Sequence, residues 1–124
     1  MDIEALYTSG INIADELGKL RHEHVAALVS LGHAEAEVTL TQARIERDII
    51  ATAGGEKQLG SNAEARKRAL TTALGIDQEY QDVVVRRNSL WSKTKGLEAS
   101  IQTDRDRLGL MKAALYAHSG NGTE

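Results

Sequence analysis

Two long stretches of this chain repeat the same spacing of apolar residues over several heptads, and this pattern constrains the fold more than any other feature. In the first stretch, heptad positions a and d hold Leu17, Leu20, His24, Ala27, Leu31, Ala34, Val38, Thr41 and Ile45, and Leu28 and Ile49 widen the stripe. In the second, they hold Tyr80, Val83, Arg87, Leu90, Thr94, Leu97, Ile101, Asp104, Leu108, Met111 and Leu115. Alternating steps of three and four residues are typical of helices that pack along one another. The sequence therefore predicts an all-α chain with two long, coiled-coil-like helices.

Clusters of glycine and polar residues set the limits of these helices. Such clusters lie at Ser9-Gly10, at residues 54–61 and at residues 119–122. Because glycine and small polar residues favour turns, we expect the first long helix over about residues 12–53, with Asn12 as its N-cap. A loop over residues 54–61 should follow it.

A short helix is expected next. Ser61 and Glu64 are spaced as in a capping box, which predicts a helix over residues 62–74. Gly75 is expected to end or bend this helix. Its apolar side should fold against one end of the two long helices, and it consists of Ala65, Ala69, Leu70 and Ala73.

The last helix matches the first in length. Asp77 is placed to cap it, and we expect it over residues 77–117, with a flexible tail at residues 119–124. Each long helix has roughly 40 residues and would be about 60 Å long. Two rods of equal length, joined by a loop and a short helix, predict an antiparallel helical hairpin. Residues 1–118 would then form a single helical domain.

Pairing about the loop gives a hypothesis for the register of this hairpin. It places His24 beside Asp104 and Arg105, and Gln42 beside Arg87. Polar side chains on the stripes would then meet polar partners. We therefore expect a polar layer at His24.

A hairpin of two helices buries one stripe on each helix and is marginally stable alone. Apolar residues also fall outside the two stripes, among them Leu6, Val25, Ile50, Val85 and Leu110. We therefore expect a homodimer that completes a four-helix bundle. Gly18 and Gly32 lie two heptads apart, and they fit either a close approach of helix backbones or ordinary exposed glycines.

The composition suits a long, thin helical packing and excludes several kinds of chemistry. The chain has no Pro, Phe or Cys, one Trp and three Tyr. Compact globular proteins draw much of their buried area from aromatic side chains. Without Cys there is no disulfide, thiol nucleophile or thiolate metal site. The acidic N-terminus and the lack of an apolar run of about 18 residues predict a soluble cytoplasmic protein that does not enter membranes.

Charge is distributed unevenly along the chain. Residues 1–61 hold ten acidic and five basic residues, whereas residues 62–118 hold seven acidic and ten basic residues. Such complementary halves are expected to pair with each other. Within the basic half, the candidate contacts for a partner or for nucleic acid are Arg66, Lys67, Arg68, Arg86 and Trp91. Basic side chains can bind phosphates, but a solvated helix surface explains this cluster as well.

No set of residues predicts catalysis, a metal site or a cofactor site. His22 and His24 point to different faces of a helix, whereas chelation needs a spacing of three or four residues. Gly55 and Gly60 have the spacing of a phosphate-binding loop, but the Lys that should follow Gly60 is missing. No nucleophile, base and acid can be assembled. We therefore expect a protein that is not an enzyme and that uses no metal or cofactor.

Residues 60–70, followed by Asp77-Gln78-Glu79-Tyr80 and a long heptad helix, resemble part of a known type of protein. Over about residues 58–117 the chain resembles small helical proteins of phages and prophages. In these, a loop ending in Gly-x-Asn precedes a short charged helix, and Asp-x-x-Tyr opens the last helix. Gly75 departs from the pattern, since Ala or Glu is more usual there. The resemblance implies a mobile-element origin in a bacterial host, no assigned function and no catalytic residues.

One functional hypothesis and two alternatives follow. We expect a non-enzymatic, dimeric interaction module of phage type that binds a host or phage protein through its helical face or its basic short helix. One alternative is an accessory DNA-binding factor in phage recombination or nuclease control. The other is a structural component of the virion.

Overall fold

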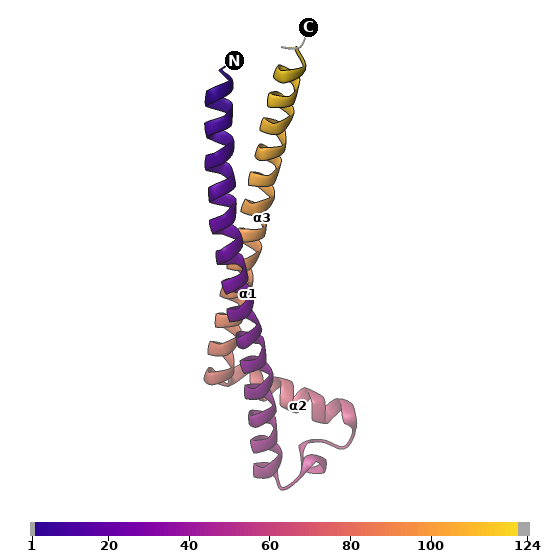
Figure 1. The fold of residues 1–124 in the computed structure, drawn as a ribbon. Helices are drawn as coiled ribbons and strands as arrows, with labels where there is room; N and C mark the ends of the chain where they lie inside the picture. Colours follow the sequence, from indigo (N-terminus) through magenta and orange to yellow (C-terminus); the bar gives the residue numbers. More distant parts are fainter. Residues whose placement is uncertain (1, 122–124) are drawn as a thin grey trace. The chain divides into compact units, whose positions relative to one another are not determined.

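The chain is all α-helical, and its computed structural model describes residues 2–121. The α-helices are α1 (Ile3–Ala53), α2 (Ala63–Ile76) and α3 (Gln78–Asn121), and a short 3-10 helix, η1 (Glu56–Leu59), precedes α2 (Figure 1). No strand occurs among the described residues, so the all-α prediction is confirmed. None of the helices in residues 2–121 is long and apolar enough to cross a membrane.

The buried residues of both long helices lie on the predicted heptad positions or on their continuation, and the other predicted positions are half-buried. On α1, the buried residues are Ile13, Leu17, Ala27, Leu31, Ala34, Val38, Thr41 and Ile45. On α3, they are Val83, Thr94, Ile101 and Asp104. All of them fall on a or d positions, and Ile13 extends the pattern one step toward the N-terminus. We call this buried stripe the seam.

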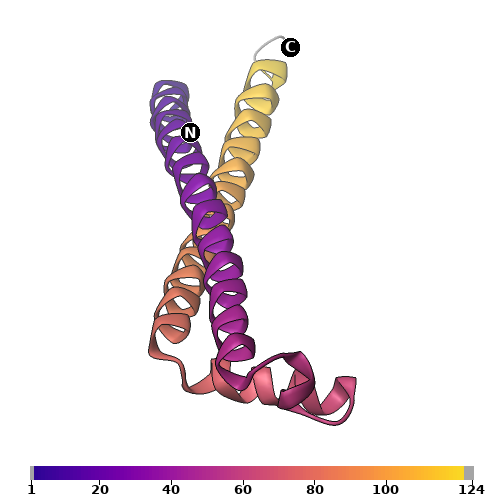
Figure 2. The same cartoon turned by 90° about the horizontal axis from the view of Figure 1, so that it is seen from below.

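The chain divides into two compact units. The terminal unit combines residues 2–28 with residues 92–121, and the loop unit is Val29–Trp91. Each unit takes one part of α1 and one part of α3, and the loop unit also holds η1 and α2. Figure 2 views the chain from below, where η1 and α2 lie beside the C-terminal part of α1 within the loop unit.

In the terminal unit, the α1 and α3 segments run in opposite directions. Ile3 and Ser119 line the same hollow, and farther along α1 the Nε2 atom of His24 lies 3.3 Å from Oε1 of Glu98. Glu98 precedes Asp104 and Arg105, the two residues expected beside His24, by six and seven positions. His24 is thus paired with Glu98 rather than with Asp104, although Arg105 lines the same hollow as His24.

The loop unit has the same antiparallel pairing, since Glu37 is paired with Arg86 and Gln42, farther along α1, with Tyr80, which precedes Arg86 on α3. It also has the same displacement. The hydroxyl group of Tyr80 donates a hydrogen bond of 3.4 Å to Oε1 of Gln42. Tyr80 precedes Arg87, the residue expected beside Gln42, by seven positions. The predicted register is thus displaced by about one heptad.

The last turns of α1 explain this displacement. The hairpin prediction assumed that α1 pairs with α3 up to its end. Instead, Ile49 and Ala53 near the end of α1 line a hollow together with Leu59 of η1 and Ala73 of α2. Because the last turns of α1 lie beside α2 and η1, the pairing of α1 with α3 ends earlier along α1.

The start of α1 also differs from the prediction. The helix begins at Ile3 rather than Asn12, and Ser9-Gly10 lies inside it. The side chain of Asp2 accepts a hydrogen bond of 3.0 Å from the backbone N–H of Glu4, which satisfies a donor of the first turn. One glycine inside a helix costs only about 1 kcal/mol relative to Ala. The glycine signal alone was therefore too weak to end the helix.

The other helices begin close to the predicted positions. Asn62, rather than Ser61, caps α2, since its Oδ1 accepts a hydrogen bond of 2.8 Å from the N–H of Ala65. Asp77 caps α3 as predicted, and its Oδ1 accepts a hydrogen bond of 2.9 Å from the N–H of Tyr80. Both caps satisfy donors that a helix leaves unpaired at its N-terminus.

The C-terminal limits of α2 and α3 lie beyond the predicted ones. Gly75 does not end α2, which continues to Ile76. Ser119 and Gly120 belong to α3, although we expected them in a flexible tail. Residues 122–124 of that predicted tail lie outside the described residues.

One charged residue lies buried on the seam. Asp104 is 5% exposed, and its Oδ2 has no hydrogen-bond partner among the described residues. Its Oδ1 lies 3.6 Å from Nη1 of Arg107, whose side chain is largely exposed. A buried carboxylate with an unsatisfied oxygen costs free energy, because water no longer solvates it. Asp104 therefore weakens the seam.

Replacing Asp104 should stabilise the protein. Asp104→Leu is expected to raise the free energy of unfolding by about 1–3 kcal/mol, because it removes a desolvated charge and adds apolar contact. Urea unfolding followed by far-UV circular dichroism measures this change. Asp106→Leu, at an exposed position of the same helix, serves as the control and should change the free energy by less than about 0.5 kcal/mol. A loss of stability in Asp104→Leu would contradict the interpretation.

Candidate functional site

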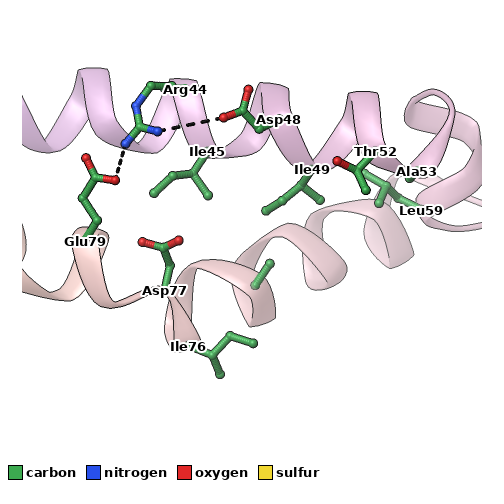
Figure 3. Close-up of a pocket in the computed structure, with 11 residues that line it drawn as sticks. Arg44, Ile45, Asp48, Ile49, Thr52, Ala53, Leu59, Ile76, Asp77 and Glu79 are labelled. Carbon is green, nitrogen blue, oxygen red and sulfur yellow. Dashed lines mark ion pairs between the residues drawn. The ribbon is translucent and has the colours of Figure 1, made fainter.

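A hollow in the loop unit lies between the end of α1 and the helix α2 (Figure 3). Its volume is about 660 Å³, within the range of roughly 300–1,000 Å³ that is usual for ligand sites. Its apolar walls are formed by Ile45, Ile49, Ala53, Leu59, Ala73 and Ile76. Its polar lining consists of Arg44, Asp48, Thr52, Asp77 and Glu79. We call this hollow the loop-unit groove.

The close-up shows how the walls are arranged. Ile45 and Ile49 project from α1 toward the ribbon of α2, and Asp77 lies between the two ribbons (Figure 3). Ile45 belongs to the buried seam, whereas Ile49 is half-buried. Ile76 lies at the outer edge and is 84% exposed. The apolar side chains that line the groove therefore range from a buried residue, Ile45, to a largely exposed one, Ile76.

Two glycines turn the chain at the end of α1. Gly54 and Gly55 have φ angles of 87° and 128°, in the region that side chains rarely adopt. Their N–H groups donate hydrogen bonds to the carbonyl groups of Ala51 (3.2 Å) and Ile50 (3.0 Å), which satisfies two of the last carbonyl groups of α1. The turn leads directly into η1 and so brings Leu59 to the groove.

Gly60 makes the closest approach between the loop and α2. A Cβ atom at Gly60 would lie 2.6 Å from Cβ of Ala65, closer than two carbon atoms can approach without movement of the backbone. The carbonyl group of Gly60 also accepts a hydrogen bond of 3.1 Å from Nε of Arg66. The close contact with Ala65 and the hydrogen bond from Arg66 thus hold the loop against the first turn of α2.

The rim of the groove carries more negative than positive groups. Arg44 forms an ion pair with Glu79, and its Nη1 lies 3.9 Å from Oδ2 of Asp48 (Figure 3). The hydrogen bond with Glu79, followed by the negative charge of that carboxylate, raises the pKa of Arg44 above its ordinary value. Asp77 contributes a third carboxylate. The lining therefore holds three acidic residues and one basic residue, which already has a partner.

The basic residues selected from the sequence lie outside this groove, and two of them are engaged within the chain. Arg66 is half-buried and bonds to Gly60, as described above. Nη1 of Arg86 donates hydrogen bonds of 2.8 and 2.7 Å to the two carboxylate oxygens of Glu37. Both arginines therefore contribute to the packing of the loop unit.

The remaining three candidates are exposed. Lys67 and Arg68 lie on the surface of α2, and their backbone carbonyl groups accept hydrogen bonds from the threonines one turn later. Trp91, on α3, is 51% exposed. Their role as contacts for a partner stays a prediction.

The loop-unit groove was not predicted from the sequence, although two signals pointed to it. One was the apolar side of the short helix, which includes Ala73. The other was Ile49, an apolar residue beside the first heptad stripe. Each signal indicated packing, and only the structure places both at a hollow with a charged rim.

At the predicted polar layer, Arg105 lines the same hollow as His24, as expected, but His24 is paired with Glu98 rather than with Asp104. Glu98 lies 3.3 Å from His24 and accepts a hydrogen bond of 3.2 Å from Nζ of Lys95. The hydrogen bonds from Lys95, and next from His24, lower the pKa of Glu98 below its ordinary value. Arg21 and Arg105 line the same hollow of about 450 Å³ in the terminal unit. Glu98 is thus surrounded by basic groups from both helices.

Glu98 should make the stability of the protein depend on acid pH. Because its folded pKa is lower than its unfolded pKa, its stabilising contribution is complete above the ordinary value of about 4.5 and is lost as the pH falls through the folded pKa. Glu98→Gln is therefore expected to lower the melting temperature at pH 7, and to lower it less at pH 3. Thermal melts followed by circular dichroism measure both differences. Glu35→Gln, at an exposed position of α1, is the control, and an undiminished effect of Glu98→Gln at pH 3 would contradict the prediction.

Gly60 should tolerate no side chain. Gly60→Ala is expected to lower the free energy of unfolding by about 1–3 kcal/mol, because the added methyl group overlaps Ala65. Gly32→Ala is the matched control, since a Cβ atom there would meet nothing within 4 Å on a continuous helix. It should instead raise stability by about 0.5–1 kcal/mol. Equal effects of the two substitutions, measured by urea unfolding, would refute the close approach at Gly60.

The loop-unit groove suits the binding of an apolar group that lies beside a charged one. No cluster of three or more potential metal-binding side chains occurs in the described part of the chain. Comparison with protein-family models, curated proteins and solved structures finds no match for this chain.

Proposed function

We propose that this chain is a non-enzymatic helical module that binds other proteins, and that its two long helices form an antiparallel hairpin. The pairing of α1 with α3 in opposite directions inside each unit supports the hairpin. The observation that carries the binding function is a set of large apolar side chains exposed outside the seam. It includes Tyr7, Ile11, Val25, Leu40, Ile76, Val85, Leu110 and Tyr116.

Some of these side chains form a row on α1 in the terminal unit. Successive members are three, four or seven residues apart, so they lie along one side of the helix. The row consists of Tyr7, Ile11, Ala14 and Gly18, and Val25 lies two turns farther along the same side, beyond Arg21 and His22, all of them exposed. Single exposed apolar residues are common, whereas a contiguous apolar surface marks a site of interaction. We call this row the outer α1 face.

A second copy of the chain fits the outer α1 face. Ala14 is small, and a Cβ atom at Gly18 would meet nothing within 4 Å, so another helix can approach the backbone closely. Tyr7 also lines a hollow of about 630 Å³ together with Ile3 and Leu115, which extends the apolar surface. Two hairpins joined along this face would form a four-helix bundle. Such a homodimer would bury side chains that a two-helix seam leaves in water.

The biological setting of this proposal rests on the sequence resemblance over residues 58–117. It makes the chain a phage-type module in the cytoplasm of a bacterial host, with a host or phage protein as its further partner. The DNA-binding alternative has less support, because Arg66 and Arg86 already bond to Gly60 and Glu37.

The outer α1 face can be tested by the mass of the protein in solution. The wild-type chain should sediment as a dimer at micromolar concentration. Tyr7→Lys combined with Val25→Lys should shift it to the monomer, because both substitutions place charges on the proposed interface. Ala113→Lys combined with Ala117→Lys is the matched control, since these side chains are exposed on α3 of the same unit and lie outside the set of large apolar side chains. Analytical ultracentrifugation over a range of concentrations measures the result.

Two outcomes would overturn the proposed face. One is a wild-type chain that stays monomeric at every concentration. The other is a Tyr7/Val25 variant that dimerises as well as the wild type. Particles larger than a dimer would instead favour a structural role in the virion.

A further inference from the structure

We propose that the loop-unit groove binds an amphipathic helix of a partner protein, in which large apolar side chains are flanked by Lys or Arg. This inference rests on the proposed function, because it names the class of protein that such a module would bind. It concerns a surface of the loop unit that is separate from the outer α1 face.

The walls of the groove provide the apolar part of the recognition. They come from three elements: Ile45, Ile49 and Ala53 from α1, Leu59 from η1, and Ala73 and Ile76 from α2. Except for the buried Ile45, these side chains keep part of their surface in water, and Ile76 is 84% exposed. An apolar side chain inserted among them would remove this surface from water, which is the main driving force of association.

The length of the groove favours a helix as the occupant. Its α1 wall extends from Arg44 to Ala53, about 15 Å along the helix axis at 1.5 Å per residue. Apolar side chains at positions i, i+4 and i+7 of a bound helix span about 10 Å. A hollow between two helices that accepts such a row is the arrangement of helix-in-groove recognition.

The rim of the groove provides the charge selection. Asp48, Asp77 and Glu79 line it, against Arg44 alone, and Arg44 is already paired with Glu79. Arg47, beside the rim, lies 3.8 Å from Asp48 and reduces the negative surplus without cancelling it. A partner with Lys or Arg beside its apolar residues is therefore favoured over one with Asp or Glu.

Two synthetic peptides of about 18 residues, long enough to form helices, test this selection on the full chain. Both carry Leu at i, i+4 and i+7, but one has Lys and the other Glu at the flanking positions. Fluorescence anisotropy of labelled peptides at low salt gives both dissociation constants. The Lys peptide should bind at least about tenfold more tightly than the Glu peptide, and added salt should reduce the difference.

Three variants locate the binding site. Asp48→Lys should weaken binding of the Lys peptide about tenfold, since it reverses a charge on the rim. Glu35→Lys makes the same charge change at an exposed position of α1 in the same unit and should leave the affinity nearly unchanged. Ala73→Trp should weaken both peptides, because the larger side chain fills the groove. Circular dichroism checks the fold of each variant, and Asp48→Lys still tests the site if Ala73→Trp does not fold.

The outcomes separate this inference from the proposed function. Equal binding of the two peptides, equal effects of Asp48→Lys and Glu35→Lys, or no binding at all would overturn the groove as a site for basic helices. If the chain still dimerises through the outer α1 face in that case, the proposed function stands. Failure of both experiments would remove the proposed function as well.

Discussion

The structure depends on one constraint, the burial of a narrow apolar stripe on each long helix. The stripe extends on α1 from Ile13 to Ile45 in alternating steps of three and four residues, with Leu20 and His24 half-buried and the others buried. Because removal of apolar surface from water drives packing, the positions of this stripe decide which face of each helix turns inward. A polar residue on the stripe loses its contact with water and therefore lowers the stability of the fold. Asp104 is the clearest case. The same constraint leaves the other faces of α1 and α3 in water, where further apolar residues remain available for contacts.

The seam could be predicted from the sequence, whereas the register could not. Heptad repeats look alike every seven residues, so a shift by one heptad keeps apolar residues facing one another. Pairing His24 with Glu98 or with Arg105, seven residues later, satisfies the same pattern. The choice depends on the last turns of α1, where Ile49 and Ala53 line a hollow together with residues of η1 and α2. That arrangement brings together separate elements of the chain, and no heptad pattern specifies it.

The loop-unit groove and the basic residues selected from the sequence lie at different places, for a related reason. A dense run of basic residues is conspicuous in a sequence, but its composition does not say what each side chain reaches. In the structure, Arg66 fastens the loop to α2 through Gly60, and Arg86 pairs with Glu37. The loop-unit groove instead combines residues from four parts of the chain, none of which is unusual alone. The cap at Asp77 was predicted correctly, because it involves only neighbouring residues, whereas Asn12 and Ser61 do not cap the helices expected to begin there.

The two proposed surfaces differ in the physical chemistry that would select their partners. The outer α1 face is a row of apolar and small residues, and Gly18 permits a close approach of backbones. Such a surface selects its partner by the fit of the two shapes, and the same helix of a second copy can provide this fit. The loop-unit groove adds carboxylates to its apolar walls, so it selects by charge as well. A partner with acidic residues beside its apolar anchors would bring like charges together at Asp48 and Asp77. Charge selection at one surface and shape selection at the other would therefore lead the two surfaces to prefer different partners.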